Sequence, residues 1–221
     1  MQLMPIRSSF AERLVIGVIL ALLLIWQPLG GCYTVPLDSP QFSNGWPTHD
    51  RRWSQVAGLY KDGDLEALVE LLQDVAAEES SWQLLALRNL AVVYKDLGQW
   101  SEAVDTYFAA IKLAGHDPEL WHDAGWALYA LGHYSAAAVA FEQSLRLAPD
   151  QPQALVGLGA ALGEYAPGQA LDHLVKATSL DSGYAIAYYE LGMVLDKLGK
   201  TAEAVEAFET ALKKDGGLTR V

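Results

Sequence analysis

The chain has 221 residues, of which 52% are hydrophobic, and this is enough apolar material for the core of one ordinary domain. Its formal net charge is −12, from 27 acidic and 15 basic side chains. This balance argues against a nucleic-acid partner, because binding to phosphate backbones depends on clustered Lys and Arg. The single cysteine, Cys32, excludes an intrachain disulfide and a zinc site built on cysteines.

Residues 1–31 have the layout of a secretory signal. Arg7 and Arg13 precede an uncharged apolar run over residues 14–26, which is shorter than the roughly 20 apolar residues of a membrane-spanning helix. The sequence LGGC at residues 29–32 then resembles the lipobox of bacterial lipoproteins. This resemblance implies cleavage before Cys32, lipidation of that residue, and a chain held at the membrane by its acylated N-terminus.

An uncleaved anchor helix is the alternative for this region. Uncharged residues continue from Leu14 to Leu37, so a helix of about 20 residues can be drawn through them, with Pro28 near its middle. Under both interpretations the two arginines stay in the cytoplasm and the rest of the chain lies outside it. For a lipoprotein, Tyr33 after the cysteine implies, by the same resemblance, an outer-membrane location facing the periplasm.

The next two segments lead into the folded part. Residues 32–50 are rich in Pro, Gly, Ser and Asn, a composition typical of a flexible tether. Residues 51–80 carry apolar residues at helical spacing on both sides of Gly63-Asp64, and are interpreted as a degenerate first repeat. Its apolar positions include Val56, Tyr60, Leu65, Leu68, Leu71 and Leu72.

The remaining segments repeat one another. The segment 118–151 contains Trp121, Gly125, Leu128, Gly132, Tyr134, Ala137, Phe141, Leu145 and Pro149. This set resembles the tetratricopeptide repeat, a unit of about 34 residues with Trp, Gly, Tyr, Ala, Phe and Pro at fixed offsets. The resemblance extends over residues 81–117, 118–151, 152–184 and 185–218, the third being one residue short. It implies an all-α fold, a superhelix (α-solenoid) of antiparallel helix pairs behind the N-terminal signal or anchor segment.

Three columns of residues keep one register through these four segments. The small residue of the first helix recurs as Ala91, Gly125, Gly159 and Gly192, at steps of 34, 34 and 33. In the second helix an alanine recurs as Ala103, Ala137, Ala170 and Ala204, and a large residue as Tyr107, Phe141, Leu174 and Phe208. Small residues let two helices approach closely while the large one fills the gap. We also expect left-handed glycines at Gly98, Gly132 and Gly199, and a distorted turn at Pro167-Gly168.

The sequence contains no arrangement of residues that is typical of a catalytic site. The five histidines never occur at the i, i+4 spacing that places two ligands on one helical face. Gly157-x-Gly159-x-x-x-Gly163 superficially resembles a dinucleotide-binding motif but falls within a predicted helix, where glycines serve close packing. Glu203, Glu206 and Glu209 have the spacing of a solvated helical face. We therefore predict no enzymatic activity, no cofactor and no metal site.

Candidate partner-binding residues lie one position away from the packing residues of the first helices. His122, Trp126 and Tyr129 are rotated by about 100° from Trp121, Gly125 and Leu128. The corresponding positions are Arg88 and Lys95 in the first clear repeat, small residues (Ala160, Gly163) that leave room in the third, and Tyr189 and Met193 in the fourth. In tetratricopeptide arrays the first helices line the concave surface, so the resemblance implies that a partner binds there.

These residues predict an aromatic groove with a basic end, suited to a peptide or helix that carries apolar anchors and an acid. Arg88, Asn89 and Lys95 partly match the set with which some family members grip a C-terminal carboxylate, whereas His122, Trp126 and Tyr129 do not. The alternative is that Trp126 and Tyr129 pack only on a neighbouring repeat.

The leading hypothesis is an envelope lipoprotein that scaffolds protein assembly, similar to tetratricopeptide lipoproteins that help build pili or recruit cell-wall enzymes. The alternative is a structural subunit of a membrane complex, held by an uncleaved transmembrane helix. The expected partners are a protein or peptide in the concave groove and the membrane through the lipid anchor, with no nucleic acid. No capping helix follows residue 218, so Val205, Phe208 or Leu212 of the last helix would be partly exposed and open to self-association.

Overall fold

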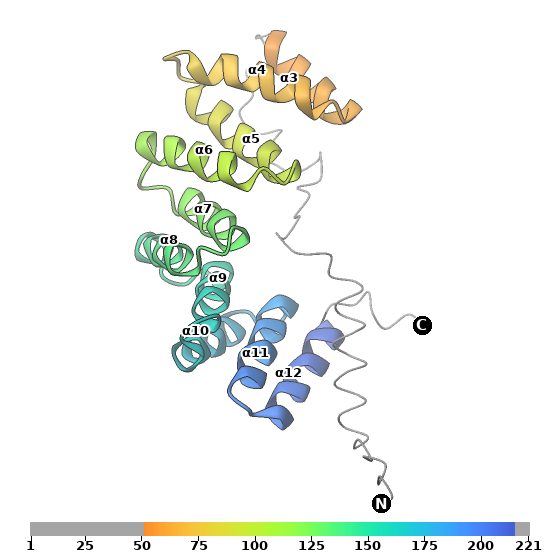
Figure 1. Cartoon of the computed structure of the whole chain (residues 1–221), viewed down its shortest axis with the longest axis vertical. Coiled ribbons are helices and arrows are strands. Elements are labelled where there is room, and N and C mark those ends of the chain that lie inside the picture. Colours follow the sequence, from red (N-terminus) through yellow and green to blue (C-terminus); the bar gives the residue numbers. More distant parts are fainter. Residues whose placement is uncertain (1–50, 215–221) are drawn as a thin grey trace, which may run out of the picture.

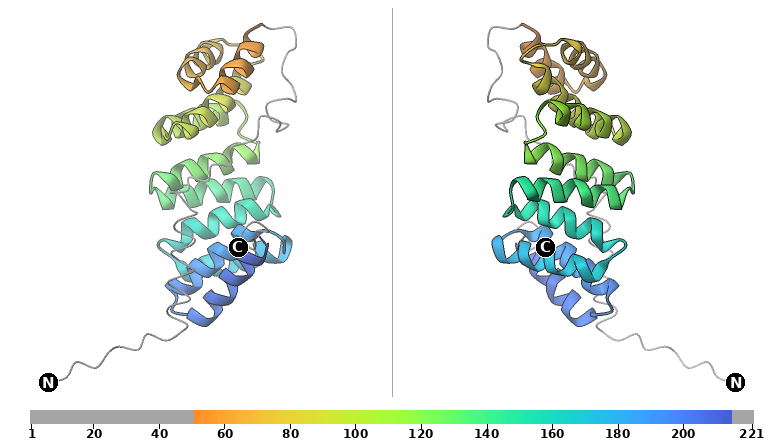
Figure 2. Two further views of the ribbon diagram at one scale, coloured as in Figure 1. Left: turned by 90° about the vertical axis from the view of Figure 1, so that its right-hand side faces the viewer. Right: turned by 90° about the vertical axis from the view of Figure 1, so that its left-hand side faces the viewer.

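The computed structural model describes residues 51–214, which form ten α-helices and no strand. The helices are α3 (Arg51–Asp62), α4 (Leu65–Ala77), α5 (Gln83–Asp96), α6 (Trp100–Leu113), α7 (Pro118–Ala130), α8 (Tyr134–Leu147), α9 (Pro152–Gly163), α10 (Pro167–Leu180), α11 (Ala185–Lys197) and α12 (Thr201–Lys214). Consecutive helices pair, and the pairs stack in chain order along the long axis of the molecule (Figures 1 and 2). The predicted all-α solenoid is confirmed. The signal segment, Cys32 and the tether lie outside the described residues.

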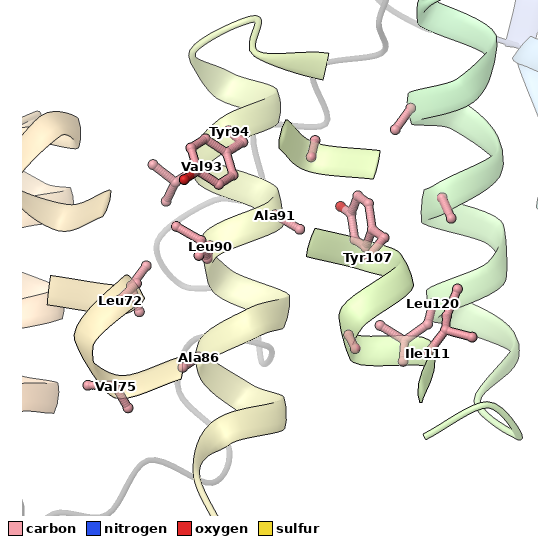
Figure 3. Packing of buried hydrophobic residues seen from close by; sticks show 14 of the residues in the cluster. Leu72, Val75, Ala86, Leu90, Ala91, Val93, Tyr94, Tyr107, Ile111 and Leu120 are labelled. Carbon is pink, nitrogen blue, oxygen red and sulfur yellow. The ribbon is translucent and has the colours of Figure 1, made fainter. Parts of the chain in front are cut away.

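The repeated small and large residues form the core of each helix pair. In the second helices Ala103, Ala137, Ala170 and Ala204 are at most 2% exposed, and Tyr107, Phe141, Leu174 and Phe208 are at most 4% exposed. Figure 3 shows one such contact region, with Ala91 of α5 near Tyr107 of α6. The degenerate pair α3–α4 extends this core through Trp53, Val56, Leu68, Leu72 and Val75, all buried. In residues 51–214 no helix combines the length and apolar character needed to cross a membrane.

Phe141 joins two successive helix pairs. An added Cβ at Gly125 of α7 would lie 2.8 Å from Phe141 Cε1, and one at Gly157 of α9 would lie 2.3 Å from the same atom. The ring therefore occupies space that only glycine leaves free on both helices. Gly159 makes the corresponding close approach to Leu174, and Gly192 to Phe208. The glycines of the apparent dinucleotide motif thus serve helix packing, as the sequence predicts.

The turn between the two helices of a pair contains a left-handed glycine in every repeat except the third clear repeat. Gly63, Gly98, Gly132 and Gly199 have φ between 72° and 76°, the left-handed conformation that ends a helix. The third clear repeat differs from expectation, because Pro167 is the first residue of α10 and Gly168 lies inside that helix. Proline fits this first position because the missing N–H has no intrahelical partner there.

The last helix differs in part from the sequence-based expectation. Val205 and Leu212 of α12 are half-buried, whereas Phe208 is only 4% exposed because its ring fills the space beside Gly192. Glu203, Glu206 and Glu209 are exposed, in agreement with a solvated face. Phe208 is therefore a core residue and does not contribute to any apolar surface at this end of the array.

Candidate functional site

The first helices of successive pairs form one continuous surface. Helix α9 contacts α7 on one side and α11 on the other, whereas each second helix contacts mainly its own partner and the helix that follows it. Side chains on the exposed sides of α7, α9 and α11 can therefore face a common ligand across three repeats. We call this surface the inner face.

Trp126 is fixed on the inner face by contacts within its own repeat. Its Nε1 donates a hydrogen bond to His122 Nε2 at 3.1 Å, and His122 Nδ1 lies 3.0 Å from Asp123 Oδ1. This arrangement fits a neutral imidazole that donates from Nδ1 and accepts at Nε2. The indole also lies edge-on to Phe141, with ring centroids 5.3 Å apart. Trp126 therefore covers a core residue of its own repeat, whereas the alternative interpretation placed it against a neighbouring repeat.

Three rings continue from this point along the surface. The centroids of Trp126 and Tyr129 are 5.6 Å apart, and those of Tyr129 and Tyr134 are 5.2 Å apart, both edge-to-face. All three side chains are half-buried, so each keeps part of its surface open to solvent. We call these three residues the aromatic wall. Rings held by mutual contacts lose little conformational entropy when a ligand covers them.

The predicted basic end is neutralised in the structure. Arg88 contacts two carboxylates at 3.1 Å, those of Asp117 and Glu119, at the N-terminal end of α7. Asn89 is 5% exposed and donates its amide to the Leu85 carbonyl oxygen at 2.8 Å, so it does not face a ligand. The charge of Lys95 acts on its neighbour Asp96. The partial match to a carboxylate-binding set therefore does not produce a free cationic clamp, and the expectation of an acid on the partner loses its basis.

The other predicted positions lie on α9 and α11. Tyr189 covers Phe208 with centroids 5.7 Å apart, and Met193 is 37% exposed. Ala160 and Gly163 of α9 are both buried, and an added Cβ at Gly163 would lie 3.0 Å from Val194 Cγ2 of α11. The room expected at these small residues is therefore closed, because α11 approaches α9 closely.

The close approach of α11 to α9 brings together charged residues that the sequence pattern does not single out. Lys197 Nζ at the end of α11 lies 2.8 Å from Glu164 Oε1, directly after α9, and donates to the Gly163 carbonyl oxygen at 3.1 Å. Glu190 of α11 lies nearby and makes no ion pair or hydrogen bond with the described residues. We call Glu164 and Glu190 the inner-face carboxylates.

Burial and repulsion between like charges raise the pKa values of Glu190 and of two nearby tyrosines. Burial, reinforced by the charge of Glu164 and opposed by Lys197, raises the pKa of Glu190 to about 7. Burial and the charge of Glu190 raise the pKa of Tyr189 to about 12. The pKa of Tyr129 is also raised, by burial and then by Glu190 and Glu164. The aromatic wall and the inner-face carboxylates are thus close enough to interact electrostatically.

Comparisons with known proteins agree with this architecture. Residues 185–218 match the family model of the tetratricopeptide repeat, and residues 68–162 match the model described as the CABIN1 N-terminal domain. The structure is similar to that of MamA, residue 41 to the end, from Desulfovibrio magneticus RS-1, with a TM-score of 0.67 and 20% identity over 76% of this chain and 95% of that chain. It is also similar to YrrB, described as a TPR protein with an unusual peptide-binding site, with a TM-score of 0.58 and 20% identity over 73% of this chain and 84% of that one.

The fold is a tetratricopeptide-repeat solenoid. Among curated sequences, Protein NPGR1 of Arabidopsis thaliana is 29% identical over 61% of this chain and 19% of its own length. Protein FlbA of Caulobacter vibrioides is 31% identical over 55% of this chain and 21% of its own length. The match thus spans about a fifth of the length of each of these two relatives.

The tetratricopeptide inner face is predominantly acidic between α7 and α11. The residues of α7, α9 and α11, together with Glu164, include the acids Glu119, Asp123, Glu164, Glu190 and Asp196 and one base, Lys197. Residues 51–214 contain no group of three or more His, Cys, Asp or Glu side chains arranged to hold a metal ion. A binding surface of aromatic rings and carboxylates is the chemistry that this arrangement offers.

Proposed function

We propose that this chain is a membrane-anchored scaffold that binds a segment of another protein on its inner face between α7 and α11. The observation that carries the proposal is the aromatic wall, whose first ring is held by the Trp126–His122 hydrogen bond and by Phe141 while part of its surface stays open. Aromatic side chains in such fixed positions are frequent anchors of protein interfaces. The peptide-binding site named for YrrB supports the same use of this fold.

We further propose that the scaffold acts in assembly at the bacterial cell envelope, in pilus biogenesis or as an adaptor for cell-wall enzymes. The LGGC sequence ending at Cys32 supports a lipid anchor, and the tether of residues 32–50 supports a folded part held away from the membrane. In this proposal the lipidated chain sits in the outer membrane and faces the periplasm. The alternative, a structural subunit with an uncleaved N-terminal helix, differs in the fate of residues 1–31.

Site-specific crosslinking in cells tests the binding face. A photoreactive amino acid at Met193, which is 37% exposed on α11, is expected to capture a discrete protein partner. The matched control is Val139, which is 54% exposed on the second helix α8 and is expected to capture none reproducibly. Capture at Val139 with none at Met193 would move the binding face to the second helices and contradict the proposal.

The anchor is tested by Cys32→Ser. We expect the variant to remain unlipidated and to leave the mature membrane-bound pool, because each buried CH₂ of an acyl chain contributes about 0.8 kcal/mol to membrane binding. Mass spectrometry of the wild-type protein from membranes should show loss of residues 1–31 and added acyl mass. If the Ser variant stays in the membrane at full length, the uncleaved helix is the anchor and the lipoprotein proposal is wrong.

A further inference from the structure

We propose that the inner face beside Tyr129 is a receptor for one lysine or arginine side chain of the partner, placed between the aromatic wall and the inner-face carboxylates Glu164 and Glu190. This inference rests on the scaffold function proposed above and specifies the chemistry of the segment that is bound. It replaces the acid-bearing partner that the sequence predicts with a basic one.

The charges beside Tyr129 are not balanced within the chain. Two carboxylates, Glu164 and Glu190, face one ammonium group, Lys197, which lies 2.8 Å from Glu164 and is also bonded to the Gly163 carbonyl. Lys197 therefore leaves Glu190 without a direct counter-ion. A second cation at this point would balance the charge of Glu190, since an opposite charge favours the ionised form of an enclosed carboxyl group.

In the unbound protein, the ionised form of Glu190 lowers the stability of the fold. Its folded pKa lies above the ordinary value of 4.5, so folding favours its neutral form and the ionised form weakens the fold as pH rises through this range. A half-buried carboxyl group that opposes stability is a frequent mark of a functional site. A bound cation would remove this cost in the complex.

Aromatic rings continue the surface next to the inner-face carboxylates. Tyr129 interacts with both inner-face carboxylates and contacts Trp126 and Tyr134 through its ring. Lysine and arginine combine a cationic head with an apolar stem, so the head can face the carboxylates while the stem packs against the rings. The wider inner face adds to the selection. Glu119 is paired with Arg88, but the remaining acids Asp123, Glu164, Glu190 and Asp196 outnumber the single base Lys197 and repel an acidic segment.

The site is open to a ligand. The side chains of Glu164 and Lys197 are 33% and 35% exposed, and Glu190 is half-buried. The charged groups that act on Glu190 are Glu164 after α9 and Lys197 on α11. The charge of Glu190 in turn acts on Tyr189 of α11 and Tyr129 of α7. The neighbouring helices α10 and α12 contribute no titratable group that acts on it.

Binding of peptide pools tests the inference. The full chain in non-ionic detergent is titrated with pools of short peptides in which one central position is fixed as Lys, Arg, Gln, Leu or Glu and the others are mixed. We expect the Lys and Arg pools to bind at least about tenfold more tightly than the Glu pool. Glu190→Gln should reduce this preference to about twofold or less. The matched control Glu142→Gln, which makes the same change on the exposed side of α8, should keep it.

A pH profile supplies a second measurement that needs no substitution. With a pKa of about 7, the ionised fraction of Glu190 rises from about a tenth at pH 6 to about nine tenths at pH 8. Affinity for the Lys pool should therefore rise about tenfold over this range for the wild type and stay flat for Glu190→Gln. The melting temperature of Glu190→Gln at pH 8 should equal or exceed that of the wild type, which separates lost binding from lost folding.

The outcomes separate this inference from the function on which it rests. Equal binding of the Lys, Gln and Leu pools, or a basic preference that survives Glu190→Gln, would overturn the receptor for a cation and leave peptide binding intact. Failure of every pool to bind, combined with no capture at Met193, would overturn both proposals.

Discussion

Replacement of Phe141 by alanine is expected to lower the free energy of unfolding by about 3–5 kcal/mol, the usual cost of removing a fully buried aromatic ring. Phe141 is 0% exposed and fills space beside Gly125 of its own repeat and Gly157 of the next. Neither glycine has a side chain that could occupy the cavity. The ring also supports His122 and Trp126, with centroids 5.9 Å and 5.3 Å away. Urea denaturation followed by circular dichroism measures the loss.

Phe208→Ala is the matched control for this substitution. Phe208 occupies the same position in the last repeat, but it packs beside one glycine, Gly192, and no described repeat follows α12. Because stability in such arrays is approximately a sum of repeats and their interfaces, the terminal substitution should cost less than the internal one. Equal losses would show that Phe141 stabilises its own helix pair alone and does not couple two repeats.

The fold could be read from the sequence because each repeat encodes its own packing. The small residue on the first helix and the large residue on the second meet in one repeat, so a column such as Gly125 and Phe141 is visible as a fixed spacing along the chain. At the end of the array Val205 and Leu212 are half-buried, within the expectation for an uncapped last helix, and Phe208 is buried like the other large residues of its column. The prediction failed at Pro167, which begins a helix where a distorted turn was expected.

The binding surface was only partly predictable. Trp126 and Tyr129 were found because they share one helix face, and their separation of three residues is a local pattern. The inner-face carboxylates arise from two helices brought together by the buried Gly163, and the angle between repeats is not encoded in the period of one helix. One signal was available: Glu164 and Lys197 are 33 residues apart, nearly one repeat length, which is the spacing of a charge pair between neighbours.

The sequence predicts a basic end to the groove, whereas the inner face of the structure is acidic. The difference also arises from contacts between repeats. Arg88 and Lys95 form a basic end in the sequence, but Arg88 is neutralised by two carboxylates at the N-terminal end of α7, of which Glu119 belongs to the following repeat. Ion pairs between repeats remove charge from a surface without any trace in the composition of a single helix. The charge available to a ligand therefore depends on which side chains remain unpaired after stacking, and Glu190 is such a residue.

Replacement of Trp126 by alanine is expected to weaken binding of the peptides selected by the wild-type protein by about 2–4 kcal/mol, the scale of a central aromatic anchor. The same substitution should lower the free energy of unfolding by about 0.5–1.5 kcal/mol beyond the lost buried area, because the indole lies against Phe141. Isothermal titration calorimetry and urea denaturation measure the two effects on one preparation.

Trp121→Ala separates anchoring from packing, since the two tryptophans share helix α7 and differ in what they contact. Trp121 donates from Nε1 to the Gly115 carbonyl oxygen at 2.9 Å and lies edge-on to Phe108 of the preceding repeat, with centroids 6.2 Å apart. Its loss should therefore lower stability and leave peptide binding unchanged. If both variants lose equal stability and both bind peptide like the wild type, Trp126 is a core residue. The half-buried Val205 and Leu212 of α12 then become the apolar surface to test.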